Sequence, residues 1–271
     1  MQPLQRTILV ACALVLAGVH SIGAAERPPI VASLDDAFIA HADSSDTWSI
    51  GSAGLELVVG FSASGTLTLQ SLSSSVTNRS WDITPGADVS LGLDGEDIQL
   101  ATRGTVAFVG ATAEANEDGV RLTFNFDHRT LHVRIARIYA SYPGSPTIET
   151  WTHIDAIAAT SPVEVSDLVG WRMTMPLGQL QWIGGLRGDS ADNPDGDAFG
   201  LVTRDLDSAE RIEIGGDGRS SEQFVPFAVV DDGRDQFFTG VMWSGIWHLV
   251  FERAGDRLNG SAFFPGPGTV V

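Results

Sequence analysis

The stretch Gln236–Phe251, QFFTGVMWSGIWHLVF, carries the clearest local pattern in the chain. The large apolar side chains at positions 247, 249 and 251 fall on one face of an extended segment, as they do in a half-buried β-strand. Ala254-Gly-Asp256 follows as a turn, and a second strand-like segment runs from Leu258 to Phe264. The stretch therefore predicts β-strands joined by tight turns.

The same period of two recurs along the rest of the chain, whereas no segment of useful length repeats at the helical period. Leu55–Phe61 and Thr66–Gln70 flank a short loop rich in serine and glycine, which predicts a hairpin. Asp118-Gly119 opens Val120–Phe126, whose apolar residues all lie on even positions. These patterns predict an all-β fold in one continuous domain, built as a packed pair of sheets.

One segment breaks the alternation. Leu131–Ile135 alternates regularly, but the phase reverses at Ala136, before Arg137 and Tyr139. A single extra residue in a strand exchanges its two faces, so this reversal predicts a β-bulge.

The first 25 residues predict a cleaved secretory signal. An apolar run, Ile8–Val19, is too short to cross a bilayer, and Gly23-Ala24-Ala25 offers the small residues that a signal peptidase requires. Leu9-Val10-Ala11-Cys12 loosely resembles a lipoprotein box, but cleavage there would cut the apolar run short, so lipidation at Cys12 is the lesser alternative. We therefore expect a signal peptide at 1–25, an N-terminal extension at 26–44, and a secreted or periplasmic protein.

Charge and composition exclude several classes of function. The formal net charge is −18, from 34 acidic and 16 basic residues, which disfavours nucleic acids and anionic membranes as partners. The chain contains no lysine, which removes Schiff-base chemistry and P-loop phosphate binding. Cys12 is the only cysteine and leaves with the signal, so disulfides, cysteine nucleophiles and zinc–thiolate sites are excluded. We expect no metal and no cofactor.

Several segments carry a joint resemblance, in order over roughly residues 45–271. The segments are Thr47–Leu57, Ser64–Leu72, Arg137–Trp151, Gly218–Glu222 with Pro226-Phe227, and Trp243–Trp247. Together they resemble the N-terminal β-domain of family 36 glycoside hydrolases, the α-galactosidases, and the first of them resembles its opening strand. Ile246 departs from the asparagine usual in that family, which puts any hydrogen bond made from that position in doubt.

The resemblance implies a two-sheet supersandwich like that of galactose mutarotase, here at 45–271. In the family a (β/α)₈ barrel follows, and two of its aspartates carry out retaining hydrolysis of terminal α-galactosides. The family's nucleophile lies in a Lys-aromatic-Asp segment, which a chain without lysine cannot contain. The resemblance therefore implies a non-catalytic domain that packs on a barrel outside this sequence. It also implies galactoside sugars as partners through that barrel, and allows a homo-oligomer.

No catalytic residue is expected in the chain. Trp243 and Trp247, four positions apart on one predicted strand face, could stack on sugar rings, although tryptophans more often fill the core between two sheets. Arg219 and Glu222 lie in a predicted loop and are candidates for contact with ligand or barrel. These four residues are our predicted substrate-binding set.

Two alternatives remain open. One is a free-standing carbohydrate-binding or mutarotase-like β-module, for which His153 and Glu149 are the nearest acid/base pair. The other is a structural or surface interaction domain with no ligand.

The acidic stretch Asp189–Asp197 could hold calcium but fails the EF-hand spacing and is expected to be a solvated loop.

Overall fold

The computed structural model describes residues 28–83, 86–186, 199–216, 221–243, 245–266 and 268–270. These residues form 21 β-strands and no helix, which confirms the predicted all-β class. It follows that the described ranges contain no helix long and apolar enough to cross a membrane. The predicted signal peptide, 1–25, and the acidic stretch Asp189–Asp197 lie outside the described residues.

The first sheet is an antiparallel meander in which each strand pairs with the next. The predicted hairpin is confirmed, and its loop closes with a hydrogen bond of 2.9 Å from the Ser62 amide to the Thr66 carbonyl. The part of 26–44 that is described supplies the first two strands. The strands are β1 (Ile30–Leu34), β2 (Ala37–Ala42), β3 (Thr47–Ser52), β4 (Leu55–Phe61), β5 (Leu67–Ser74) and β6 (Arg79–Asp82).

The segment Thr47–Leu57, expected as one strand, is instead split between β3 and β4. Ala53 and Gly54 connect them, with φ of 48° and 81°. Two consecutive positive φ values are typical of a type I′ turn, whose twist matches that of the strands beside it. Alanine is uncommon at such a position, and for this reason the residue types alone did not predict a turn here.

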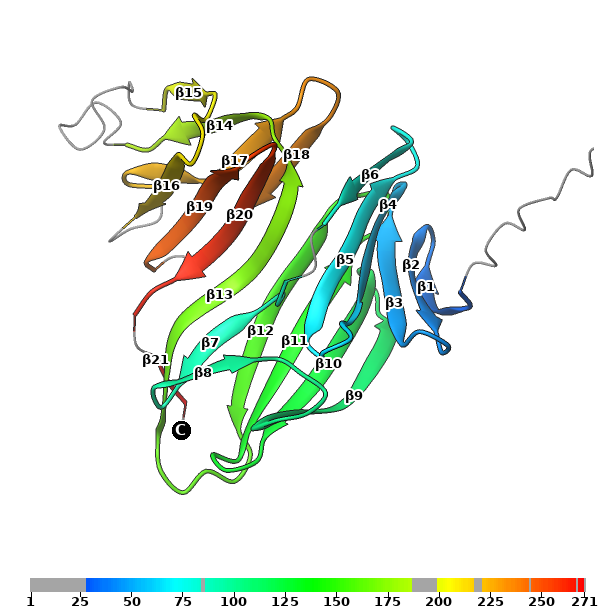
Figure 1. The fold of residues 1–271 in the computed structure, drawn as a ribbon. Helices are drawn as coiled ribbons and strands as arrows, with labels where there is room; N and C mark the ends of the chain where they lie inside the picture. Colours follow the sequence, from blue (N-terminus) through cyan, green and yellow to red (C-terminus); the bar gives the residue numbers. More distant parts are fainter. Residues whose placement is uncertain are drawn as a thin grey trace, which may run out of the picture.

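The second sheet packs on the first and completes a sandwich (Figure 1). Phe124 lies at the centre of this interface, with its ring centroid 6.1 Å from that of Trp48 and 6.2 Å from that of Phe61. The sheet runs in the order β12-β11-β10-β9, and its strands are β9 (Val106–Ala115), β10 (Val120–His128), β11 (Val133–Ser141) and β12 (Ile148–Ala156).

The prediction of a β-bulge at Ala136 is wrong. β11 pairs with β10 in unbroken register from Val133 to Ser141. Arg137 keeps the inward position that the alternation gives it and is fully buried. A buried charged side chain therefore produced the apparent phase reversal.

That buried arginine has a partner on the other layer. Asp88, in the connection between β6 and β7 (Ser90–Leu93), is also fully buried and accepts hydrogen bonds from Arg137 Nε at 2.7 Å and Nη2 at 3.1 Å. The Tyr139 hydroxyl donates to the same carboxylate at 2.5 Å. Burial, together with the Asp88 charge, raises the pKa of Tyr139 well above its usual range. Paired in this way, a charge can occupy the core of the sandwich.

Two further sheets form a second sandwich beside the first (Figure 1). The third sheet has the order β16-β19-β20-β13-β7-β8, with β21 paired to β13, and the fourth has the order β15-β14-β17-β18. Their strands are β7 (Ser90–Leu93), β8 (Glu96–Gln99), β13 (Val163–Pro176), β14 (Gln179–Gly184), β15 (Leu201–Arg204), β16 (Arg211–Gly216), β17 (Phe224–Asp231), β18 (Gln236–Gly240), β19 (Trp247–Ala254), β20 (Arg257–Phe264) and β21 (Gly268–Val270).

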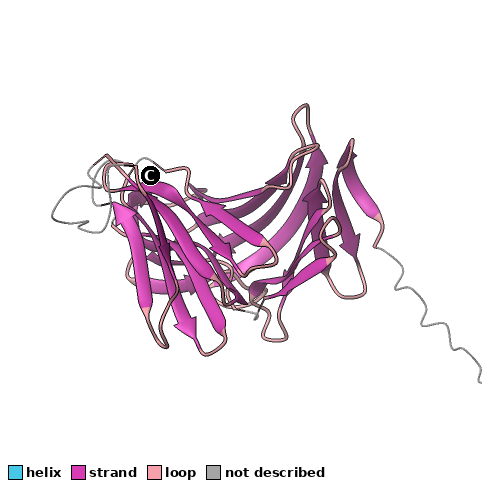
Figure 2. Ribbon diagram, turned by 90° about the horizontal axis from the view of Figure 1, so that it is seen from above, coloured by secondary structure: helices cyan, strands magenta, loops and turns pink. Residues whose placement is uncertain are grey.

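Hydrogen bonding thus divides the described strands into four sheets, where the sequence predicted a pair. The two sandwiches diverge when the molecule is seen from above (Figure 2). The long strand β13, in the second sandwich, lies beside β12 and β6 of the first, so it connects the two sandwiches. Buried residues from all four sheets belong to one hydrophobic core.

Candidate functional site

The structure separates the two tryptophans expected to share a strand face. The stretch Gln236–Phe251 contains β18 and β19, which belong to different sheets and do not pair with each other. Trp247 begins β19 and is 0% exposed, so it belongs to the core. Trp243 lies in the connection and is 56% exposed, with its ring 6.1 Å from Phe264. The expectation of a shared face is therefore wrong, and only Trp243 can reach a ligand or partner.

Of the other two predicted contact residues, the structure describes only Glu222. Arg219 lies outside the described residues. Glu222 is half-buried in the segment that enters β17. The same segment pairs with the end of β14, where the Gly185 amide donates to the Gln223 carbonyl at 2.7 Å. A Cβ at Gly185 would collide with the backbone of Ser221 and Glu222, so this close approach requires glycine.

Exposed apolar side chains gather at this end of the fourth sheet, which we call the apolar end. Phe199 and Val241 are placed there by hydrogen bonds to Gly185 and Pro226, at 3.3 and 2.8 Å. Exposed apolar groups gathered in one region typically mark an interaction surface. The side chains of the apolar end are Leu186, Phe199, Leu201, Met242, Trp243 and Ile246, and Met242 is the most exposed at 86%.

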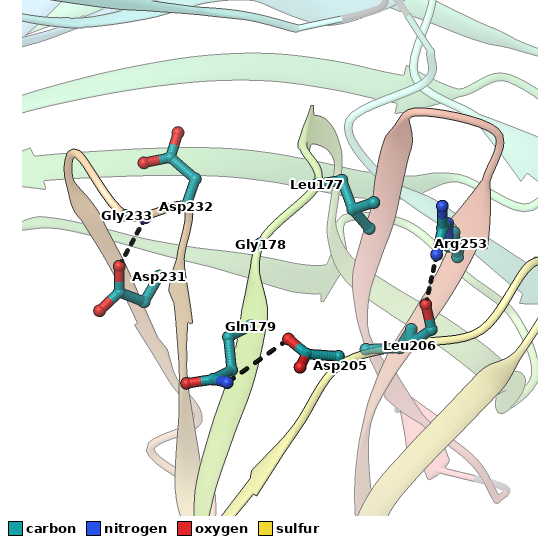
Figure 3. Close-up of a pocket in the computed structure, with 9 residues that line it drawn as sticks. All are labelled: Leu177, Gly178, Gln179, Asp205, Leu206, Asp231, Asp232, Gly233 and Arg253. Atoms are coloured by element: carbon teal, nitrogen blue, oxygen red, sulfur yellow. Dashed lines mark hydrogen bonds between the residues drawn. The ribbon is translucent and has the colours of Figure 1, made fainter.

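A hollow of about 480 Å³ lies where the third and fourth sheets meet (Figure 3). In the close-up the Asp232 carboxylate points away from Gln179 and Asp205. The lining residues are Leu177, Gly178, Gln179, Asp205, Leu206, Asp231, Asp232, Gly233 and Arg253.

The polar groups of this hollow bind one another. Arg253 donates from Nη1 to the Leu206 carbonyl at 2.6 Å and from Nε to the Gly255 carbonyl at 3.0 Å. Asp231 accepts from Gln236 Nε2 at 2.9 Å and from the Gly233 amide at 2.8 Å, and these bonds lower its pKa. A glycosidase acid needs a raised pKa instead. The arrangement therefore braces a junction between sheets and does not resemble an acid/base site.

The proposed mutarotase-like pair does not converge. His153 Nε2 lies 2.9 Å from Asp155 Oδ2, and Glu149 accepts a hydrogen bond of 2.7 Å from the Tyr142 hydroxyl. Positions four apart on one strand stand about 13 Å from each other, too far to act on one sugar ring. In the described part of the chain no three His, Cys, Asp or Glu side chains gather as a metal ion would require.

No family model matches the chain, and no curated protein matches its sequence. Its fold is similar to that of solved α-galactosidases. AgaB of Geobacillus stearothermophilus, a GH36 α-galactosidase, matches with a TM-score of 0.64 and 9% identity over 85% of this chain. The α-galactosidase of Lactobacillus brevis matches with a TM-score of 0.63 and 10% identity, also over 85%.

A third similar structure is a variant of AgaA from Geobacillus stearothermophilus in complex with raffinose, with a TM-score of 0.61 and 9% identity over 82% of this chain. The likeness is one of fold. The chain covers 39% of AgaB, 38% of the Lactobacillus brevis enzyme and 39% of AgaA, so it corresponds to less than half of each.

Proposed function

We propose that the chain is the N-terminal, non-catalytic domain of a secreted α-galactosidase-like glycoside hydrolase. The observation that carries this proposal is the fold likeness, which spans 85% of this chain but only 39% of AgaB. The part of AgaB that this chain does not cover is long enough to contain a catalytic barrel. The barrel would supply the two carboxyl groups of a retaining mechanism and would bind the galactoside.

The proposed role of this domain is to pack on that barrel through the apolar end. Met242 and Trp243 are exposed in the isolated chain, and burying each against a partner would contribute about 1.5–3 kcal/mol. Glu222, beside the same end, would then lie near the rim of the sugar pocket and help to shape it. Secretion follows from the signal-like residues 1–25, and the same surface could instead support a homo-oligomer.

The free-standing mutarotase-like module is the less favoured function, because His153 and Glu149 are held apart by separate partners. The direct test is to assay the purified chain for release of galactose from raffinose and from an aryl α-galactoside. We expect no hydrolysis. Activity that co-purifies with the chain would overturn the non-catalytic assignment.

The docking role has a separate test. A barrel polypeptide from the same gene should unfold at a higher temperature when this chain is added in trans. Trp243→Ser should reduce that stabilisation, whereas Val76→Ser, at an even more exposed position in the turn between β5 and β6, should not. If the two substitutions reduced the stabilisation of the barrel equally, the apolar end would not be the docking surface.

A further inference from the structure

The outer face of the second sheet carries a mixed group of side chains that the proposed function does not use. The pairing register of β10, β11 and β12 shows which residues lie side by side on the face that points away from the first sheet. Thr123 lies opposite Ile138, which lies opposite Trp151. In the next row Arg121 lies opposite Ala140, which lies opposite Glu149. We call Arg121, Thr123, Ile138, Glu149 and Trp151 the Trp151 platform.

Trp151 and Arg121 meet diagonally across β11. The guanidinium carbon of Arg121 lies 5.7 Å from the centroid of the Trp151 ring, a cation–π contact. Ala140, the small residue between their rows, is only 4% exposed even though it belongs to the outer face. The indole is nevertheless 36% exposed, so part of its apolar surface remains accessible to solvent.

Arg121 has hydrogen-bonding capacity to spare. Its Nε is buried and has no hydrogen-bond partner among the described residues. Its Nη1 lies 3.7 Å from Glu114 Oε1, which is an ion pair but too long for a hydrogen bond. The Arg121 side chain as a whole is 42% exposed, so a ligand would reach the guanidinium through its other nitrogens and not through the buried Nε.

Glu149 places an acceptor beside the same ring. Its Oε2 accepts a hydrogen bond of 2.7 Å from the Tyr142 hydroxyl, which holds the carboxylate in position. That hydrogen bond, with burial, raises the pKa of Tyr142 to about 12. The phenol therefore stays protonated at neutral pH and continues to donate to Glu149.

We propose that the Trp151 platform binds a neutral saccharide. A pyranose presents an apolar C–H face for stacking and hydroxyls that both donate and accept, which matches an indole flanked by a guanidinium, a carboxylate and the Thr123 hydroxyl. The net charge of −18 disfavours an anionic ligand such as a nucleic acid or a sulfated sugar.

The test is isothermal titration of the full chain with galactose, raffinose, galactomannan and a linear glucan. We expect at least one of these neutral saccharides to bind, and Trp151→Ala to weaken that binding at least tenfold, with Trp151→Phe retaining part of it. Arg121→Ala should weaken it several-fold. Phe238→Ala, at an exposed aromatic side chain of β18, is the control and should bind as the parent does, and Trp243→Ala tests the apolar end separately.

Circular dichroism and thermal unfolding of each variant should match the parent, because each substituted side chain is at least one-third exposed. Absence of binding to all four probes would overturn the proposal, as would binding that survives Trp151→Ala. Loss of binding in Trp243→Ala alone would place the sugar at the apolar end and would equally overturn it. None of these outcomes changes the raffinose hydrolysis assay, so the two proposals stand or fall separately.

Discussion

Arg79, at the start of β6, and Asp232, in the turn between β17 and β18, form a two-pronged ion pair that joins the two sandwiches. Arg79 Nη1 donates to Asp232 Oδ1 at 2.8 Å, and Nη2 contacts Oδ2, between residues 153 positions apart. Beside this pair the Thr77 hydroxyl donates to Asp235 Oδ2 at 2.8 Å. The side chains of Arg79 and Asp232 are only 18% and 11% exposed, so water screens the pair weakly.

Arg79→Ala should lower the free energy of unfolding by about 1–3 kcal/mol, because it leaves a shielded carboxylate without its charged partner. Asp232→Asn keeps an acceptor for the turn amides of Arg234 and Asp235, which Asp232 Oδ1 now receives at 3.0 Å each. Urea unfolding of both single variants and of the double variant gives the coupling free energy between Arg79 and Asp232. If the two effects simply add, the ion pair does not stabilise the junction.

Arg137→Ala should be more damaging, by about 3–5 kcal/mol, since it leaves the buried Asp88 carboxylate without its cation. The double variant Arg137→Met with Asp88→Asn removes both charges and keeps an acceptor for the Tyr139 hydroxyl, so it should recover much of that loss. Chemical denaturation of the three proteins measures this. A double variant as unstable as Arg137→Ala would mean that the volume of Arg137, and not the unpaired charge, decides its effect.

The two tryptophans of the stretch Gln236–Phe251 should respond in opposite ways. Trp247→Ala should cost about 3–5 kcal/mol because it empties a fully buried site. Trp243→Ala should change the free energy of unfolding by no more than about 0.5 kcal/mol in the isolated chain. Comparable losses from both, in thermal or urea unfolding, would contradict the assignment of Trp247 to the core and Trp243 to a surface.

Both tyrosines of the chain should resist ionisation in alkali. The pKa of Tyr142 is raised to about 12 by its hydrogen bond to Glu149 and by burial, and that of Tyr139 is raised well above its usual range. Because the folded-state pKa exceeds the unfolded value of 10.0, the stabilisation from Tyr142 is complete below pH 10 and is lost as the pH rises through about 12. Phenolate absorbance during a pH titration checks this, with Tyr142→Phe isolating Tyr139. A transition near pH 10 in the folded protein would contradict the described hydrogen bonds.

Local turn chemistry made much of the fold predictable. Asp118-Gly119 and Ala254-Gly-Asp256 both lie between paired strands in the structure, as expected from residues that favour tight turns. Alternation likewise placed the inward residues of β10 correctly, from Val120 to Phe126. These signals come from neighbours in sequence, which is why a single chain reveals them.

Long-range pairing was not predictable in the same way. The placement of Arg137 inside the sandwich depends on Asp88, which lies 49 positions away and on another layer. The separation of β18 from β19 depends on pairing with β17 and β16, which no local pattern encodes. For the candidate site this meant that the shared strand face predicted for Trp243 and Trp247 does not exist, although Trp243 is exposed. In the Trp151 platform only Glu149 and Trp151 are close in sequence, and Arg121 joins them through strand register.

The measurement that tests the central claim most directly is the nucleotide sequence immediately downstream of the codon for Val271. The account predicts an open frame of several hundred codons that encodes alternating strands and helices of a barrel, with a Lys-aromatic-Asp segment at the end of one strand. A stop codon directly after Val271 would contradict it, and would leave saccharide binding without a catalytic partner as the function to pursue.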